Sequence, residues 1–335
     1  MPRTRVRLRD VAERAGVSPT TASFVLAGRN DMRISAAAQE RVLQAATELN
    51  YRPNLAARGL RTKTTHTIGL ISDTIATEQY AGEFIRGALA AALEHDHLLV
   101  IGETEGDPDV EARLVRGMLD RQVDGLIYGT MFTKEIKLPD GPGQHPLVLL
   151  NCLSPRLPGP AVIPDEYNAG RTAARALVGA GHRDGIYLVG ECPAHVYAAR
   201  ERRRGITAEL SESGSGLSGT VDCSWWPEPA YEAVHRLLAH GPLPRAFICL
   251  NDRTAMGVYQ ALHEAGIDIP GGASVVSFDD SGLASWLRPK LTSIALPHFE
   301  MGHRAAELLI GNELEPVLHR VAMPLRARSS IAAPG

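Results

Sequence analysis

The sequence predicts a small all-α helix-turn-helix domain followed by a larger α/β domain with two lobes and parallel sheets. Three observations predict this. The first 50 residues place apolar side chains at helical spacing. From residue 67, short apolar strands alternate with helical patterns, which is typical of parallel sheets covered on both faces. The charge divides near the same place: residues 1–64 hold 12 basic and 5 acidic residues, against 23 and 33 in the remainder.

Composition excludes several classes of protein. A chain of 335 residues is long enough for more than one domain, and 44% hydrophobic residues are typical of a globular fold. No apolar run reaches the roughly 18 to 20 residues of a membrane span, and no apolar segment follows the basic N-terminus as in a secretory signal. The four cysteines form no C-x-x-C pair. We therefore expect reduced thiols in a cytoplasmic protein that holds no metal and no cofactor.

The start of the chain predicts two short helices joined by a tight turn. The first helix has one apolar face, formed by Leu8, Val11, Ala12 and Ala15. Gly16 is suited to the left-handed conformation that ends a helix. Ser18 stands where a helix cap is expected, and Pro19 takes the first helical position. The side chains of Ala22, Val25 and Leu26 of this second helix are expected to face the core, and the helix is expected to end near Gly28.

A third helix is predicted from Ser35 to about Leu49. Its expected apolar face consists of Val42, Leu43, Ala46 and Leu49. Two helices joined by a glycine-containing turn match the helix-turn-helix, whose second helix lies in the major groove of DNA. The N-terminal turn of that helix meets the base edges, which singles out Pro19, Thr20, Thr21, Ser23 and Phe24. Solvated surface residues are the alternative, but the basic charge of this segment favours a polyanion.

Three segments carry a resemblance to a known family. LRDVAERAGVS, LNYRPNLAARGLR and HTIGLI together resemble the LacI/GalR family of bacterial transcription regulators. The resemblance implies that YRPNLAARGLR contains a hinge helix that orders on operator DNA and wedges Leu60 into the minor groove, a known way of kinking DNA. Two departures are Arg7, where the family often has a capping threonine, and the pair Ala22 and Phe24 in the recognition helix. The predicted DNA contacts are Ser18, Pro19, Thr20, Thr21, Ser23, Phe24, Asn30, Tyr51, Asn54, Ala57, Arg58, Leu60 and Arg61.

The domain organisation follows from the patterns and the resemblance. We expect a DNA-binding headpiece at 1–52, a hinge helix and linker at 53–66, and an effector-binding and dimerisation domain at 67–335. Apolar strands such as THTIGLISD, VDGLIYG, GIYLVGE and ASVVSFDD form two runs that divide near Asp165. The segment LTSIALP returns the chain toward the first lobe. The expected lobes are 67–164 with 297–323, and 165–296 with 324–335, in the periplasmic-binding-protein-like fold that the resemblance implies.

An enzyme and a transport protein are the alternatives from other classes. Residues 214–219 satisfy G-x-G-x-x-G, but they follow a predicted helix and precede a strand, the reverse of a dinucleotide-binding loop. No Walker loop, H-E-x-x-H or G-x-S-x-G motif is present. A solute-binding protein for transport is disfavoured by the basic helical head. An enzyme is therefore not expected.

The candidate effector site is predicted at the carboxyl ends of the strands, where ligands of open α/β sheets bind. This rule selects Asp73, Asn151, Asp165, Glu191, Asn251, Asp252 and Asp279. The resemblance implies an effector-binding arginine at Arg200, polar contacts from Asp73, Asn251 and Asp279, and aromatic stacking by Trp225 and Tyr80. The predicted effector-binding residues are Asp73, Tyr80, Asn151, Arg200, Trp225, Asn251 and Asp279. Helix capping is the alternative role for Asp279, and core packing for Trp225.

Carboxylates, an arginine and a flat aromatic face suit a polyhydroxylated ring. We therefore expect a sugar effector, with a purine or other non-sugar ligand as the alternative. The predicted protein is a ligand-responsive transcription regulator that binds double-stranded operator DNA, and we expect a repressor of sugar-utilisation genes. Release from the operator by the effector is the expected response, and corepression is the alternative. Two-fold symmetry of a homodimer would match a pseudo-palindromic operator. No membrane partner is expected, and the site of action is the nucleoid in the cytoplasm.

Overall fold

The computed structural model describes residues 6–26, 34–51, 64–75, 82–138, 145–156, 159–194 and 196–334. The chain divides into two compact units, residues 1–65 and 66–335. Most of the predicted hinge segment lies outside the described residues, including Asn54, Ala57, Arg58, Leu60 and Arg61. Asn30 and Tyr80 also lie outside them. The roles predicted for these residues stay predictions.

Unit 1 contains the helix-turn-helix. Its described helices are α1 (Leu8–Ala15), α2 (Pro19–Leu26) and α3 (Ala36–Glu48). Gly16 ends α1 with a φ of 64°, a left-handed conformation that glycine adopts without strain. The Ser18 hydroxyl accepts a hydrogen bond of 3.0 Å from the backbone N–H of Thr21, and Pro19 is the first residue of α2. The predicted stop and start signals are both confirmed.

The three helices share a small core. Its buried members are Val11, Ala12, Ala15, Ala22, Val42 and Ala45. One predicted core residue is wrong, because Leu43 keeps 53% of its surface exposed. Successive residues of an α-helix are turned by about 100°, so the face that buries Val42 and Ala45 directs Leu43 outward. The Arg41 guanidinium donates to the Ala15 carbonyl at 3.1 Å and so ties α3 to the end of α1.

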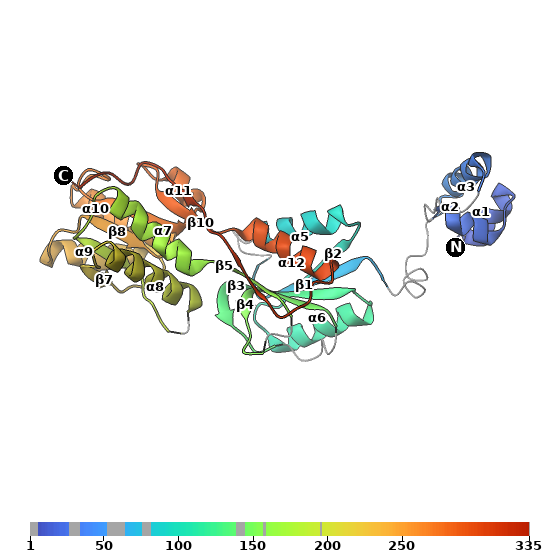
Figure 1. Ribbon diagram of the computed structural model, residues 1–335, viewed down its shortest axis with the longest axis horizontal. Helices are drawn as coiled ribbons and strands as arrows, with labels where there is room; N and C mark the ends of the chain where they lie inside the picture. Colours follow the sequence, from blue (N-terminus) through green and yellow to red (C-terminus); the bar gives the residue numbers. More distant parts are fainter. Residues whose placement is uncertain are drawn as a thin grey trace. The chain divides into compact units, whose positions relative to one another are not determined.

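Unit 2 begins with a sheet that defines the first lobe. Its strands are β1 (Thr67–Ser72), β2 (Leu98–Glu103), β3 (Gly125–Glu135), β4 (Leu147–Leu153), β5 (Ala161–Pro164) and β11 (Leu318–Val321). They lie in the order β11-β5-β4-β3-β1-β2, and each pair is parallel. Helices α5 (Gly82–Glu94) and α12 (His298–Ile310) pack on one face, and α6 (Pro108–Asp120) packs on the other (Figure 1).

A second sheet defines the second lobe. Its strands are β6 (Ile186–Val189), β7 (Gly219–Val221), β8 (Ala246–Cys249), β9 (Ser274–Asp279), β10 (Thr292–Ala295) and β12 (Leu325–Arg326), in the order β12-β10-β9-β8-β6-β7. One face is covered by α7 (Glu166–Gly179) and α8 (Tyr197–Glu212), the other by α9 (Pro227–His240) and α10 (Asp252–Glu264). A short helix, α11 (Gly282–Trp286), follows β9. The parallel prediction is confirmed except for β12, which pairs antiparallel with β10.

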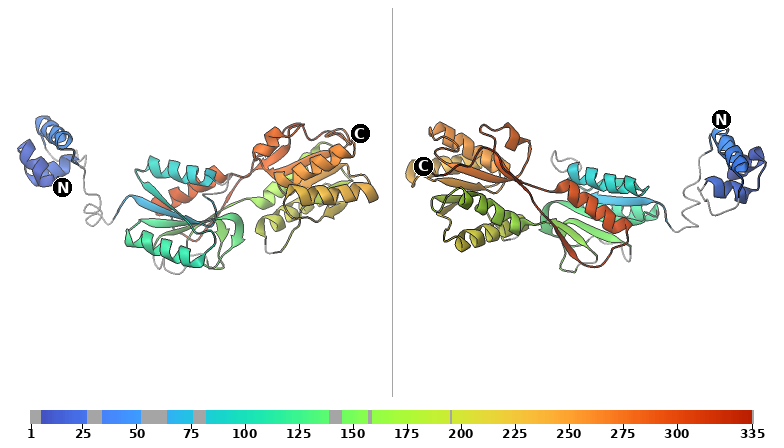
Figure 2. Two further views of the ribbon diagram at one scale, coloured as in Figure 1. Left: turned by 180° about the vertical axis from the view of Figure 1, so that it is seen from behind. Right: turned by 45° about the horizontal axis from the view of Figure 1, so that its top comes forward.

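The two lobes are joined by three crossings of the chain, which Figure 2 shows from two sides. The crossings lie between β5 and α7, between β10 and α12, and between β11 and β12. Each lobe is therefore built from segments that are not contiguous in the sequence. The residue boundaries proposed for the lobes stay predictions.

Two features of the described residues bear on the alternatives that the sequence raised. The glycine-rich residues 214–219 link α8 to β7, so a helix precedes them and a strand follows, opposite to the order of a dinucleotide-binding loop. None of the described helices is long and apolar enough to cross a membrane.

Candidate functional site

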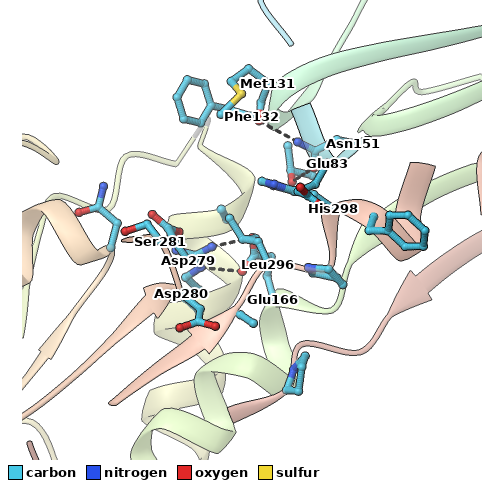
Figure 3. A pocket seen from close by; sticks show the side chains of 18 of the residues that line it. Glu83, Met131, Phe132, Asn151, Glu166, Asp279, Asp280, Ser281, Leu296 and His298 are labelled. Carbon is cyan, nitrogen blue, oxygen red and sulfur yellow. Dashed lines mark hydrogen bonds and ion pairs between the residues drawn. The ribbon is translucent and has the colours of Figure 1, made fainter. Parts of the chain in front are cut away.

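A cavity of about 700 Å³ lies between the two lobes. Its volume falls within the range of about 300 to 1,000 Å³ that is usual for small-molecule sites. Both lobes and the crossing segments contribute to its wall, and Figure 3 shows ten labelled lining residues. From the first lobe these include Glu83, Met131, Phe132, Thr133 and Asn151, and from the second Glu166, Arg202, Trp225, Asn251, Arg253, Asp279, Asp280 and Ser281.

The most buried charged groups in the wall are Arg202 of α8 and Glu166 of α7, whose side chains are each only 2% exposed. The Nε and Nη2 atoms of Arg202 donate to the two carboxylate oxygens of Glu166 at 2.6 and 3.0 Å. Its Nη1 atom donates to the Leu250 carbonyl at 2.5 Å and lies 3.9 Å from the Asp279 carboxylate. The guanidinium plane also packs over the Phe278 ring, 4.4 Å from its centroid. These contacts hold a planar cation rigidly at the cavity wall.

Small residues bring Arg202 and Glu166 together. Helices α7 and α8 cross at Gly170 and Gly205, where a Cβ atom on either glycine would lie about 2 Å from a backbone oxygen of the other helix (2.2 and 2.0 Å). No larger residue fits at this close approach. Glu166 lies one turn before Gly170, and Arg202 lies three residues before Gly205. The crossing of the helices therefore sets the salt bridge.

The prediction for Arg200 is corrected by this geometry. Arg200 is absent from the cavity wall; its side chain is 45% exposed, donates to the Ala194 carbonyl at 3.0 Å and stacks on Tyr197. Two residues along an α-helix correspond to a rotation of about 200°, so Arg200 and Arg202 face nearly opposite sides of α8. The useful signal was the spacing of three between Arg202 and Gly205, which places both on the face that packs against α7.

Asp279 stands at the end of β9 with its carboxylate at the cavity surface. Its backbone has a φ of 105°, and its side chain is 29% exposed. Loss of hydration on burial raises the pKa of Asp279 to about 8, and the carboxylates of Asp252 and Glu166 act in the same direction against Arg202. Near neutral pH this carboxyl group therefore carries a proton in most molecules and can donate as well as accept a hydrogen bond.

Asp252 lies behind the wall rather than in it. It is fully buried and accepts hydrogen bonds from the hydroxyls of Ser277, Ser281 and Ser293 and from the Ser281 backbone N–H. Burial raises the pKa of Asp252 despite these bonds. Its role is to position the loop after β9, whose residues Asp280 and Ser281 line the cavity.

Asn251 and Trp225 line the cavity in linked positions. The Asn251 amide caps α10 by accepting from the Thr254 N–H at 2.8 Å, and it donates to the Trp225 carbonyl at 3.3 Å. The Trp225 indole N–H donates to the Glu191 carbonyl at 3.0 Å. Glu191 therefore acts through its backbone and is not part of the wall. The fixed indole offers the cavity an aromatic surface.

Of the predicted residues Asn151, Asp73 and Asp165, only Asn151 lines the cavity. Asn151 lines the cavity, but its amide already accepts from the Thr133 hydroxyl at 2.6 Å and donates to two backbone carbonyls of β3. Asp73 lies outside the wall: it accepts from the Met131 N–H and from Lys134 Nζ, both at 2.8 Å, and so holds the extended end of β3. Asp165 is also outside the wall, because its carboxylate caps α7.

Of the predicted DNA-contacting residues, Pro19, Thr20, Thr21, Ser23 and Phe24 lie on α2 of unit 1, and Ser18 directly precedes it. Ser18, Pro19 and Thr20 are exposed at its start. The hydroxyl of Thr21 lies 2.8 Å from that of Ser18, while Ser23 and Phe24 are half-buried. Tyr51 packs against the core of the unit. The exposed polar groups at the N-terminus of α2 suit contacts with base edges and phosphates.

A helix-turn-helix unit joined to a two-lobed domain with a small-molecule cavity defines the class of ligand-responsive DNA-binding regulators. Residues 7–54 match the model of bacterial regulatory proteins of the lacI family, and residues 174–331 match that of the periplasmic binding protein-like domain. The chain is 31% identical over 327 residues to the ribose operon repressor of Escherichia coli strain K12, covering 95% of this chain and 96% of the relative. The chain belongs to the lacI family of bacterial regulatory proteins, which are transcription regulators.

Two solved structures resemble the whole chain. A lac repressor dimer bound to operator and the anti-inducer ONPF superposes with a TM-score of 0.78 at 24% identity, covering 98% of this chain and all of that one. A complex of the transcriptional regulator CelR with cellobiose superposes with a TM-score of 0.64 at 25% identity, covering 97% of this chain and all of that one. The first likeness supports the fold, including the periplasmic-binding-protein-like arrangement of the lobes.

Proposed function

We propose that the chain is a homodimeric repressor of sugar-utilisation genes that leaves a pseudo-palindromic operator when a sugar binds between its lobes. The observation that carries this proposal is the cavity at the carboxyl ends of the strands, where a buried guanidinium, a largely protonated carboxyl group and a fixed indole lie together. Hydroxyl groups of a sugar bond to the polar groups, and its apolar face stacks on the indole.

The effector set we propose is Arg202, Asp279, Trp225, Asn251 and Asn151. The relatives support a sugar, since one represses a ribose operon and another was solved with cellobiose. Asp73 and Asp165 support the wall from behind and take no part in binding. No catalytic role is proposed for any of these residues.

DNA binding is assigned to unit 1 and the segment that follows it. Ser18, Pro19 and Thr20 read the major groove, and the basic residues supply affinity for phosphates. Leu60 in the hinge segment enters the minor groove. Two copies of the chain present two such units to the two halves of the operator, and the protein acts on the chromosome in the cytoplasm.

The effector cavity is coupled to the DNA-binding units through the chain segments that join the two lobes. Leu296, Pro297 and Pro324 belong to the segments that join the lobes, and each lines the cavity. A ligand that contacts both lobes and these segments shifts the population of lobe arrangements, and this shift changes the spacing of the hinge segments in the dimer.

The experiment that tests this proposal combines DNA selection with a sugar screen. A DNA library is enriched on the full chain, and the affinity for the selected fragment is measured with increasing salt and with sugars. We expect a pseudo-palindromic site, a strong salt dependence and loss of binding with at least one sugar. Binding without sequence preference would refute the regulator role. Sequence-specific binding that no sugar changes would refute the sugar effector alone.

A further inference from the structure

The loop after β9 has an unusual backbone at the cavity. Asp279 and Asp280 are consecutive residues with positive φ, 105° and 51°, and neither is a glycine. Both residues line the cavity together with Ser281 (Figure 3). Residues with a side chain adopt the left-handed region only where the surrounding structure holds them there. The groups that hold this loop are therefore candidates for a role in effector binding.

Two of these supports act on the backbone of the loop. The Asp280 N–H donates to the Ser293 hydroxyl at 3.0 Å, and the Ser281 N–H donates to the Asp252 carboxylate at 2.7 Å. The Ser293 hydroxyl donates to Asp252 in turn, at 2.8 Å. These bonds fix the main chain but do not hold the carboxylate of Asp280.

The third support is Arg328, which holds that carboxylate. Its Nη2 atom donates to Asp280 Oδ1 at 2.6 Å, and the two side chains are only 19% and 18% exposed. Its Nη1 atom donates to the Leu291 carbonyl at 2.9 Å, and its backbone N–H donates to the Thr292 hydroxyl at 3.0 Å. A guanidinium held in this way fixes the direction of the carboxylate that it binds.

The C-terminal segment that carries Arg328 is itself bound to the sheet of the second lobe. Ser330 is fully buried. Its hydroxyl donates to the Val275 carbonyl of β9 at 2.6 Å and accepts from the Thr292 N–H of β10 at 2.8 Å. The backbone near Arg328 is therefore fixed relative to both strands.

The same segment leads back to the last crossing between the lobes. Arg326 of β12, two residues before Arg328, lines the cavity, and its Nε atom lies 3.8 Å from the Asp280 carboxylate. The crossing from β11 enters the second lobe immediately before β12. Asp280 thus ties the loop after β9 to a segment that joins the lobes.

Loss of Arg328 would free the side chain of Asp280. A half-buried carboxylate without its hydrogen-bonded cation gains hydration by turning toward water. Arg326 cannot replace the lost partner, because 3.8 Å is beyond hydrogen-bond distance and its side chain is 57% exposed. Rotation of Asp280 would release the left-handed backbone and move the adjacent Asp279 away from its place at the cavity.

We propose that Arg328 is a positioning residue of the effector site, which holds Asp280 so that the loop after β9 presents Asp279 to the ligand. Arg328 is not part of the cavity wall and acts through Asp280. Its effect on binding rests on the proposed sugar effector. The inference adds the C-terminal segment to the parts of the chain that determine effector affinity.

The first test needs no sugar. Amide hydrogen exchange of the full chain is followed in peptides that cover residues 279–284 and, as an internal reference, α5 of the first lobe. In R328A the loop should exchange at least about tenfold faster, while α5 should not change. R328K keeps a cation at Asp280 and should show a smaller increase. R183A is the matched control, because Arg183 is an exposed arginine of the second lobe that donates only to the Val178 and His182 carbonyls in the described structure and lies outside the wall.

The second test measures sugar affinity by calorimetric titration. The probes are ribose, glucose, galactose, lactose and cellobiose, and the variants are compared with the probe that binds the unmodified chain most tightly. R328A should bind it at least about tenfold more weakly, the size expected for loss of a hydrogen bond to a charged group. R328K should lose less, and R183A should bind it as the unmodified chain does.

A double variant distinguishes positioning from general support of the fold. In the D280A background the addition of R328A should change the affinity for the same probe by less than about twofold, because Arg328 acts through the carboxylate that is already absent. Support of the fold through Leu291 and Thr292 would persist in that background. Urea unfolding of each variant confirms that the titrated protein is folded.

The possible results separate this inference from the sugar effector. Loop exchange in R328A within about twofold of the unmodified chain overturns the positioning role, whichever sugar binds. A tenfold loss of affinity that recurs in the D280A background also overturns it. If none of the five probes binds, the sugar effector is contradicted, and the exchange rates alone then decide whether Arg328 positions the loop.

Discussion

The two lobes contribute differently to the same cavity. In the first lobe, the predicted polar residues are already engaged: Asn151 bonds to Thr133 and to the backbone of β3, and Asp73 holds β3 from behind. In the second lobe, Arg202 is likewise engaged by Glu166 and the Leu250 carbonyl, whereas Asp279 presents a proton-bearing carboxyl group at the cavity surface. We propose from this comparison that the second lobe supplies polar recognition through Asp279 and that the first lobe supplies a fixed shape.

The largest effect is expected from Arg202→Ala. The substitution leaves the Glu166 carboxylate buried without its partner, which should lower the free energy of unfolding by roughly 3 to 5 kcal/mol. Arg200→Ala is the matched control, because Arg200 is exposed on the other side of the same helix, and it should change stability by about 0.5 kcal/mol or less. Urea unfolding measures both. Equal losses would mean that the arginines were assigned wrongly.

The next largest effect is expected in the pH dependence of the free energy of unfolding, to which Asp279 contributes. Its pKa is raised to about 8 in the folded chain from 3.8, so the folded state holds a proton that the unfolded state releases between these values. The free energy of unfolding should therefore fall as the pH rises from 5 to 8, by on the order of 1 kcal/mol per pH unit at the steepest. Asp279→Asn removes this proton, and its unfolding curve should be flatter by that amount. Parallel curves for the two proteins would disprove the raised pKa.

A smaller effect is expected in the first lobe. Thr133→Val keeps the shape of the side chain but removes the donor to Asn151, at a cost of about 1 kcal/mol in stability. Sugar affinity should change by no more than about threefold, because the hydroxyl serves the wall and not the ligand. Thermal unfolding and titration on the same samples separate the two quantities. A loss of sugar affinity much larger than threefold would erase the distinction between the lobes.

Unit 1 should respond independently of both lobes. Thr20→Ala removes an exposed hydroxyl at the start of α2 and should weaken operator binding by about 1 to 2 kcal/mol with stability unchanged. Thr47→Ala, an exposed threonine of α3, is the control and should bind operator normally. Fluorescence anisotropy with labelled operator measures both affinities. An equal effect of both variants would show that α2 is not the reading helix.

Local signals were enough to predict much of the fold. Gly16, Ser18 and Pro19 fix the turn of unit 1 through conformational and capping preferences that act within a few residues. The apolar strands could equally be predicted from the sequence, as could the helix before and the strand after residues 214–219. What failed depends on the angle at which elements face each other: the outward turn of Leu43, the antiparallel edge strand β12 and the choice between Arg200 and Arg202.

The candidate site was predicted in part for the same reason. Strand ends pointed to Asn151, Asn251 and Asp279 at the cavity, because parallel strands end at one edge of a sheet. The same rule also selected Asp73 and Asp252, which the fold turns behind the wall. Contacts between residues that are far apart in the sequence decide whether a carboxylate faces a cavity or a neighbouring hydroxyl. A local sequence pattern cannot predict such contacts.

The most direct measurement is operator affinity with and without sugar in the unmodified chain and in Asp279→Ala, which removes both the donor and the acceptor of this carboxyl group. The sugar is the one in the sugar screen that most raises the melting temperature; at 100 times its Kd it should stabilise the chain by about 2.7 kcal/mol. We predict that this sugar weakens operator binding at least tenfold in the unmodified chain and much less in the variant, whose operator affinity without sugar is unchanged. An equal sugar response in both proteins would contradict the claim that the second-lobe polar groups read the effector.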